Sequence, residues 1–205
     1  MHNVFISYHH DNDQKYKEEL LKLNGVGENR IFIDGSVNTG GISDDLSDEE
    51  IRQEIRDEYL RDTTVTIVLV GLETKGRKHI DWETYSSMFD GTVNKKSGIL
   101  VVKLPSTGCT LSTAVHANEK EIIHPEVRPE DWIHINSRTT YEERYPYLSD
   151  RIIDNLLSRD TKISVVPWYK INNDRGKLQF LIDAAFKDRA SCNYDLSRPL
   201  KRQNS

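Results

Sequence analysis

Cysteine is scarce in this chain: only Cys109 and Cys192 occur, far apart and without the spacing of a metal or redox motif. A disulfide framework is therefore not expected, and a reducing compartment is favoured. Basic residues are also too few to dominate, since 28 Lys and Arg stand against 33 Asp and Glu and the formal net charge is −5. A large basic surface for nucleic acid is not expected on such a chain.

Long apolar runs are missing as well, because no segment approaches the roughly 20 residues that a membrane-spanning helix needs. The first residues, Met1-His2-Asn3-Val4-Phe5, lack a charged region followed by an apolar stretch, so no signal peptide is expected. Neither of the glycine-rich phosphate-binding motifs, GxxxxGK[ST] or GxGxxG, occurs. The sequence therefore predicts a soluble cytoplasmic protein without a membrane partner.

What the chain does contain is a regular alternation of short apolar runs with helix-like segments. The predicted strands are residues 4–6, 30–34, 65–70, 98–105 and 132–135, and helical spacing of apolar residues follows each of the first three and the last. Alternation of this kind indicates a parallel sheet with helices on both faces. We therefore predict an α/β, flavodoxin-like three-layer fold with a five-stranded parallel sheet in the order 2-1-3-4-5.

The pattern loosens after residue 160, so we place the main domain at residues 1–160 and a C-terminal extension at 161–205. Residues 163–169 predict an edge strand or an ordered extension, because Pro167 is tolerated only at an edge. Apolar residues between 178 and 186 predict one more helix, which we expect to pack on the main domain. The polar end, Arg198 to Ser205, is expected to be frayed.

Several of these segments, in this order, resemble TIR domains. Val4-Phe5-Ile6-Ser7-Tyr8 resembles the first TIR box, residues 30–34 resemble the second strand, and the Gly-rich stretch from Gly35 resembles the BB loop. Residues 64–71 look like the third strand, and Ile80-Asp81-Trp82-Glu83 looks like the helix start where enzymatic TIR domains keep a catalytic glutamate. The resemblance covers roughly residues 3–157. It is closest to the bacterial TIR-like branch that includes the TIR proteins of Thoeris antiphage defence.

The resemblance implies an enzyme that cleaves the bond between nicotinamide and ribose in NAD, with Glu83 as the catalytic residue. A carboxylate there would stabilise the oxocarbenium ion that develops as nicotinamide leaves. NAD would be the substrate, and no metal or further cofactor is expected. The product would be an ADP-ribose signal nucleotide; transfer to water or to a purine nitrogen, which would make it cyclic, stays open. A glutamate at this place without such a context would be a solvated helix residue.

Four further residues are assigned to binding NAD. Ser7 and Tyr8 end the first strand and Asp34 ends the second, where a parallel sheet opens to its ligands. His79 lies four residues before Glu83 and so on the same helical face. The alternative role of Ser7 is a helix-capping hydroxyl, that of Tyr8 is a packed aromatic ring, and that of Asp34 is the start of a turn. In many TIR domains an aromatic residue stands at the place of His79, and a valine follows it.

A metal site in the run His9-His10-Asp11-Asn12-Asp13 is not favoured, because adjacent residues rarely converge on one ion. We expect a loop there, with Asp11 or Asp13 capping the next helix. The loop from Gly35 to Asp45 is expected to be mobile.

Two other functions stay open. One is a non-catalytic TIR module that assembles with other TIR surfaces. The other is a flavodoxin-like response or nucleotide-binding domain; a response domain needs a phosphoacceptor aspartate and a late-strand lysine, for which Asp34 and Lys103 are a poor match. The expected partners of the enzyme are a downstream effector protein that senses the nucleotide product and a second TIR domain.

Overall fold

A five-stranded, fully parallel sheet lies at the centre of the computed structural model, which describes residues 1–36, 45–92 and 94–204. The strand order is β2-β1-β3-β4-β5, so the predicted flavodoxin-like order is confirmed. The strands are β1 (His2–Ser7), β2 (Phe32–Asp34), β3 (Val65–Val70), β4 (Gly98–Lys103) and β5 (Ser164–Pro167). Most of the loop that was expected to be mobile lies outside the described residues.

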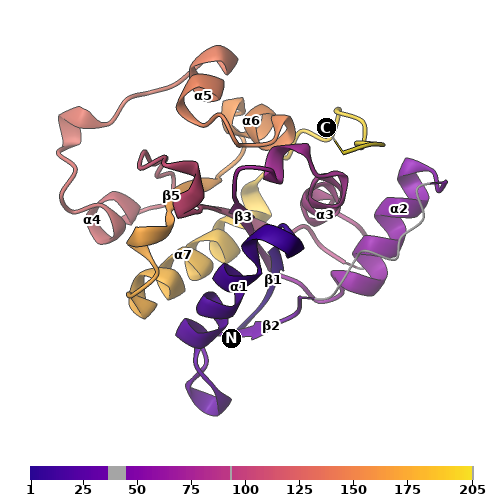
Figure 1. The fold of residues 1–205 in the computed structure, drawn as a ribbon, viewed down its shortest axis with the longest axis horizontal. Coiled ribbons are helices and arrows are strands. Elements are labelled where there is room, and N and C mark those ends of the chain that lie inside the picture. Colours follow the sequence, from indigo (N-terminus) through magenta and orange to yellow (C-terminus); the bar gives the residue numbers. More distant parts are fainter. Residues whose placement is uncertain (37–44, 93, 205) are drawn as a thin grey trace.

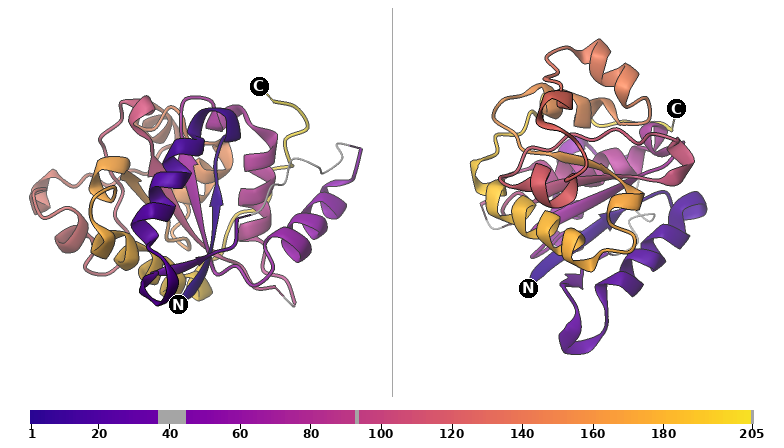
Figure 2. Two further views of the ribbon diagram at one scale, coloured as in Figure 1. Left: turned by 60° about the horizontal axis from the view of Figure 1, so that its bottom comes forward. Right: turned by 90° about the vertical axis from the view of Figure 1, so that its left-hand side faces the viewer.

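Helices cover both faces of the sheet (Figures 1 and 2). They are α1 (His10–Asn24), α2 (Asp48–Glu54), α3 (Lys78–Met88), α4 (Glu119–Ile123), α5 (Arg138–Arg144), α6 (Asp150–Leu157) and α7 (Arg175–Asp188). On one face, α1 and α7 bury apolar side chains against β1, β3 and β4. On the other face, α3, α5 and α6 pack on β3, β4 and β5. This is the three-layer arrangement that parallel strands require.

The start of α2 carries the reciprocal capping that the run Ser47-Asp48-Glu49-Glu50 favours. Ser47 Oγ accepts a hydrogen bond from the Glu50 backbone N–H at 3.3 Å, and the Glu50 carboxylate accepts one from the Ser47 backbone N–H at 2.8 Å. This reciprocal capping satisfies two backbone donors that a helix start leaves open. The helix then continues as a π-helical turn, Ile55–Tyr59.

The predicted fifth strand is wrong. Trp132–Ile135 forms an irregular segment after the 3-10 turn Pro129–Asp131, and its Ile133 is 58% exposed. The fifth strand is Ser164–Pro167, in which all four residues are buried, as a strand covered on both faces requires. Residues after 160, expected as an extension of the domain, therefore supply the edge strand of the sheet and α7. Pro167 stands at the last position of that edge strand, where its missing N–H does not interrupt the ladder.

The polar end of the chain was predicted to be frayed, and this is wrong for its described residues, which end at 204. Residues 193–204, which we call the C-terminal strap, run from α6 across α3 towards α2 (Figure 1). Leu200 is only 4% exposed and belongs to an apolar cluster with Phe5, Ile51 and Trp82. The strap is ordered because it buries this leucine and because its backbone finds hydrogen-bond partners on the helices beneath it.

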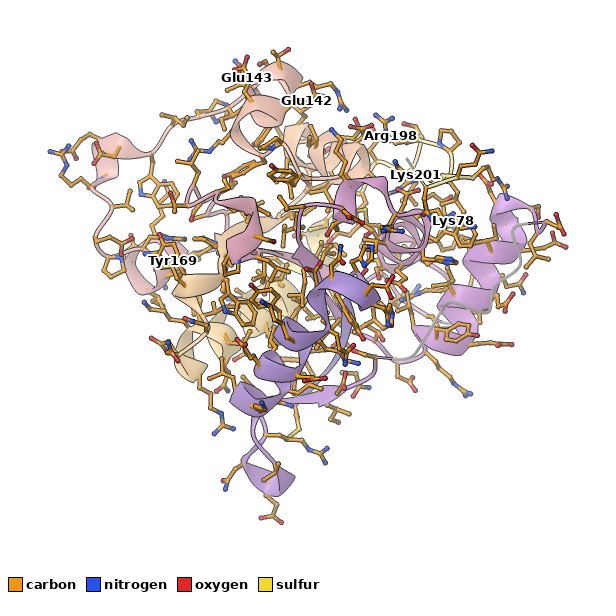
Figure 3. The ribbon with its side chains drawn as sticks, viewed as in Figure 1. Lys78, Glu142, Glu143, Tyr169, Arg198 and Lys201 are labelled. Carbon is orange, nitrogen blue, oxygen red and sulfur yellow. The ribbon has the colours of Figure 1, made fainter. Side chains whose placement is uncertain are left out.

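A buried ion pair fixes the strap and α3 to α6. The Arg151 guanidinium donates to both carboxylate oxygens of Asp81, at 2.8 and 3.0 Å. It also donates to the backbone carbonyls of Arg198 and Pro199, and Asp81 accepts from the Lys201 N–H at 3.0 Å. Figure 3 shows Lys201 of the strap on the same side of the molecule as Lys78 of α3. Three segments far apart in the sequence thus meet at one pair of charges.

Candidate functional site

The Glu83 carboxylate lies at the C-terminal end of β1, beside one of the residues assigned to NAD binding. Ser7, the last residue of β1, donates its hydroxyl to Glu83 Oε2 at 2.6 Å, and both residues are buried. The contact follows from strand alternation, since Val4 and Ile6 face α1 and α7 whereas Phe5 and Ser7 face α3. Glu83 occupies the second turn of α3, one turn deeper than a helix-capping position. A 4% exposed glutamate is not the solvated helix residue that a chance occurrence would give.

Tyr8 lies next to Ser7 in sequence but points to the other face of the sheet. Its hydroxyl donates to Gln14 Oε1 at 2.6 Å, and its ring packs on His10 with a centroid distance of 4.4 Å. Burial raises the pKa of the Tyr8 hydroxyl, and the negative charges of Glu83 and Asp34 raise it further. Tyr8 therefore shares the electrostatic environment of Glu83, although its hydroxyl is held by α1.

Asp34 is exposed at the end of β2 and starts a turn. Its Oδ1 accepts a hydrogen bond from the Ser36 N–H at 3.0 Å, and Ser36 Oγ in turn accepts one from the Ile6 N–H at 3.0 Å. These bonds carry the pairing with β1 beyond β2, up to the residue before Ser7. The turn-forming role of Asp34 is thus visible, and its contact with a ribose stays a prediction.

His79 packs against Trp82 rather than standing apart from it. The two rings meet edge to face, with centroids 4.9 Å apart at 74°. Trp82 itself is fully buried, and its Nε1 donates to the Lys201 carbonyl of the strap at 2.7 Å. The tryptophan before Glu83 is therefore a core residue that anchors α3, and the binding role of His79 stays a prediction.

Two buried polar residues beside β1 were missed by the sequence analysis. α1 begins with His9 as its N-cap residue, without a side-chain cap, so the predicted cap at Asp11 or Asp13 is wrong. Asp13 is instead turned inwards, where it is 4% exposed and burial raises the pKa of its carboxyl. It lies so close to Gly71 that a Cβ built there would be 2.6 Å from Asp13 Oδ2. His9, 5% exposed, places Nε2 at 3.4 Å from the Glu73 carboxylate.

These residues form a polar group around the ends of β1 and β3. Its glycine, Gly71, is the first residue after β3, whereas His9 caps α1 shortly after β1 and Asp13 lies in the first turn of that helix. The signal in the sequence was the dense polar run after the first strand combined with a glycine after the third. Among the described residues, no group of three or more potential metal-binding side chains comes together. What the arrangement offers chemically is the Glu83 carboxylate, fixed by the Ser7 hydroxyl, with the Asp13 carboxyl and the His9 imidazole buried after the same strand.

Comparison with protein families decides the relationship. The family model described as Thoeris protein ThsB, TIR-like domain, matches residues 5–108, about half of the chain. The chain belongs to this family. The match begins in β1, extends past β4, and contains all five predicted site residues of the TIR-like domain. No curated protein and no solved structure gives a significant match. None of the helices in the described part of the chain has the length and apolar character to cross a membrane.

Proposed function

We propose that this Thoeris TIR-like protein is an enzyme of antiphage defence that cleaves the nicotinamide–ribosyl bond of NAD, with Glu83 as its catalytic residue. The observation that carries the proposal is the buried Ser7–Glu83 hydrogen bond at the C-terminal end of β1. Ligands of open parallel sheets bind at that edge. The family membership gives a second, independent support.

The geometry suggests a division of roles. The Ser7 hydroxyl orients the Glu83 carboxylate, so that its charge is already in place before the substrate arrives. As the bond to nicotinamide breaks, positive charge develops on the ribose, and a preorganised anion in a site of low polarity stabilises that charge strongly. Nicotinamide leaves as a neutral molecule, so its departure does not require an acid. The ADP-ribosyl group then passes to a nucleophile, and the product would be read by a separate effector protein.

The test is to incubate the purified protein with NAD and to measure nicotinamide and nucleotides by mass spectrometry. Glu83→Gln should lower turnover at least about 100-fold, because a neutral amide cannot stabilise the cation as a charge does. Ser7→Ala, which removes only the orienting hydrogen bond, should have a smaller effect. Glu58→Gln is the matched control, since Glu58 is exposed on the π-helical turn after α2.

The same variants should be compared in bacteria during phage infection, so that an enzyme needing an infection signal is also detected. Full NAD turnover after Glu83→Gln would show that Glu83 is not catalytic. No NAD loss in either setting would favour the alternative, a TIR module that acts by assembly.

A further inference from the structure

A cavity of about 510 Å³ lies beside the outer strand β5, on the side of the sheet remote from β2 and β1. Its walls come from residues 112–115, the segment 132–136, α5 and the end of α6. Figure 1 shows the chain between α4 and α5 arching away from the sheet, on the side remote from α2 and α3. The cavity has the size of ordinary small-molecule sites, roughly 300–1,000 Å³. All of its lining residues lie beyond residue 108, where the family match ends.

The charged residues that line this cavity are all basic. They are Lys120, Arg144 and Arg159, and no aspartate or glutamate is among the lining residues. None of the three is joined to a carboxylate by an ion pair within the described residues. Figure 3 shows Glu142 and Glu143 of α5 at the top of the molecule, and neither residue lines the cavity. Three cations without carboxylate partners are notable in a chain whose net charge is −5.

The wall of the cavity is held in place by the sheet. Thr113 and Val165 of β5 exchange two backbone hydrogen bonds, each of 2.9 Å. Behind this wall, the buried Glu119 carboxylate accepts from the backbone N–H groups of Val115 and His116. Arg144 donates to the Ser112 carbonyl at 3.1 Å, so its guanidinium is anchored at the wall while keeping its full charge. The wall around Thr113 and the Arg144 guanidinium are therefore already in place before a ligand binds.

An aromatic surface completes the cavity. Trp132 is half-buried, its ring meets His124 edge to face at 5.3 Å, and the Lys120 ammonium lies 4.8 Å from the ring centroid. Guanidinium groups bind phosphate oxygens in pairs, and aromatic rings provide packing surfaces for nucleobases. We propose that this cavity is a second ligand site that binds a nucleotide, with its phosphates at the three basic side chains and its base against Trp132.

The first experiment measures binding of ADP and of pyrophosphate to the full chain by isothermal titration calorimetry at low ionic strength. Arg159→Gln and Lys120→Gln should each weaken ADP binding about tenfold or more, because each removes a charge-assisted contact. Both side chains are exposed, so the variants should fold. Arg61→Gln, at an exposed arginine outside the cavity, should change the affinity less than about twofold. An ADP affinity that is absent, or that responds equally to Arg61→Gln, overturns the proposal.

The second experiment tests whether the ligand is a nucleotide rather than a bare phosphate compound. Trp132→Ala should weaken ADP binding while leaving pyrophosphate binding unchanged, because only ADP carries a base. An equal loss of affinity for ADP and for pyrophosphate would show that Trp132 does not contact a nucleobase, and would contradict the assignment of a nucleotide as the ligand. Glu83→Gln separates this cavity from the Ser7–Glu83 contact: a loss of ADP affinity in that variant would place ADP at the end of β1 and contradict the second site. The outcome is independent of whether the protein cleaves NAD.

Discussion

Replacing Arg151 by methionine is expected to be among the most damaging single changes in this protein. The Arg151 side chain is fully buried, and its partner Asp81 is 4% exposed. Methionine has a similar length but no charge and no hydrogen-bond donor. The change would leave the Asp81 carboxylate in the interior without its cation, and the carbonyls of Arg198 and Pro199 without the donor they have now.

The size of the effect follows from this burial. Removing one partner of a buried ion pair costs about 3–5 kcal/mol, because the remaining charge is desolvated without compensation. That is a large part of the ~5–15 kcal/mol by which a domain is stable. The exposed pair between Arg128 and Asp131 is a matched control, since the two side chains are 70% and 48% exposed. Arg128→Met should cost less than about 1 kcal/mol.

Urea unfolding followed by circular dichroism measures both effects. With a slope of about 2 kcal/mol per molar, a loss of 4 kcal/mol moves the midpoint by about 2 M. The double variant Asp81→Leu with Arg151→Met should recover part of the loss, because no charge is then left in the interior. A shift of less than about 0.5 M for Arg151→Met would refute the reasoning, since it would mean that the Asp81 carboxylate reaches water or another cation.

Two further predictions concern packing and pH. Gly98→Ala should destabilise the fold by about 1–3 kcal/mol in the same assay, because its Cβ would lie 2.2 Å from the Ala185 carbonyl oxygen; Gly176→Ala, which meets nothing closer than 3.4 Å, should be neutral or slightly stabilising. The pKa of His124 is lowered to about 4, first by burial and then by the charge of Lys170, so the unfolded chain takes up a proton before the folded protein does. The contribution of His124 to the free energy of unfolding is complete above about pH 6.5 and falls by up to about 1.4 kcal/mol per pH unit as the pH drops towards 4. His124→Gln should reduce this dependence of stability on pH. An unchanged dependence in the variant would exclude His124 as its cause.

The sequence predicted those parts of the fold that are encoded within a short window. β1, β3 and β4 are continuous apolar runs, and the capping box at Ser47 is a local pattern. The position of Glu83 beside Ser7 also followed from the sequence, because parallel strands bring their carboxyl ends to one edge of a sheet. The strand order was predicted from the alternation of strands and helices, which favours the flavodoxin-like order even when one strand is misplaced.

What the sequence did not predict depends on contacts between distant segments. β5 has only four residues and follows β4 after about sixty residues that include three short helices. The isolated run at 132–135 was therefore taken as the fifth strand, and residues 163–169 only as an edge strand or an ordered extension. Asp13 and Asp81 are charged, and charged residues are normally exposed, yet both are buried by partners far away in the sequence. The polar end of the chain likewise became ordered only because Leu200 finds a place against α2 and α3.

The cluster that holds Leu200 has a consequence for the order in which the protein is made. Phe5 is translated long before Leu200, yet both belong to the same apolar cluster around Trp82. Synthesis at about 5–20 residues per second leaves that face of the nascent chain uncovered for many seconds. During this interval α2 and α3 present apolar surface that a chaperone can bind. The face that contains β1 is thus closed by a segment translated long after that strand.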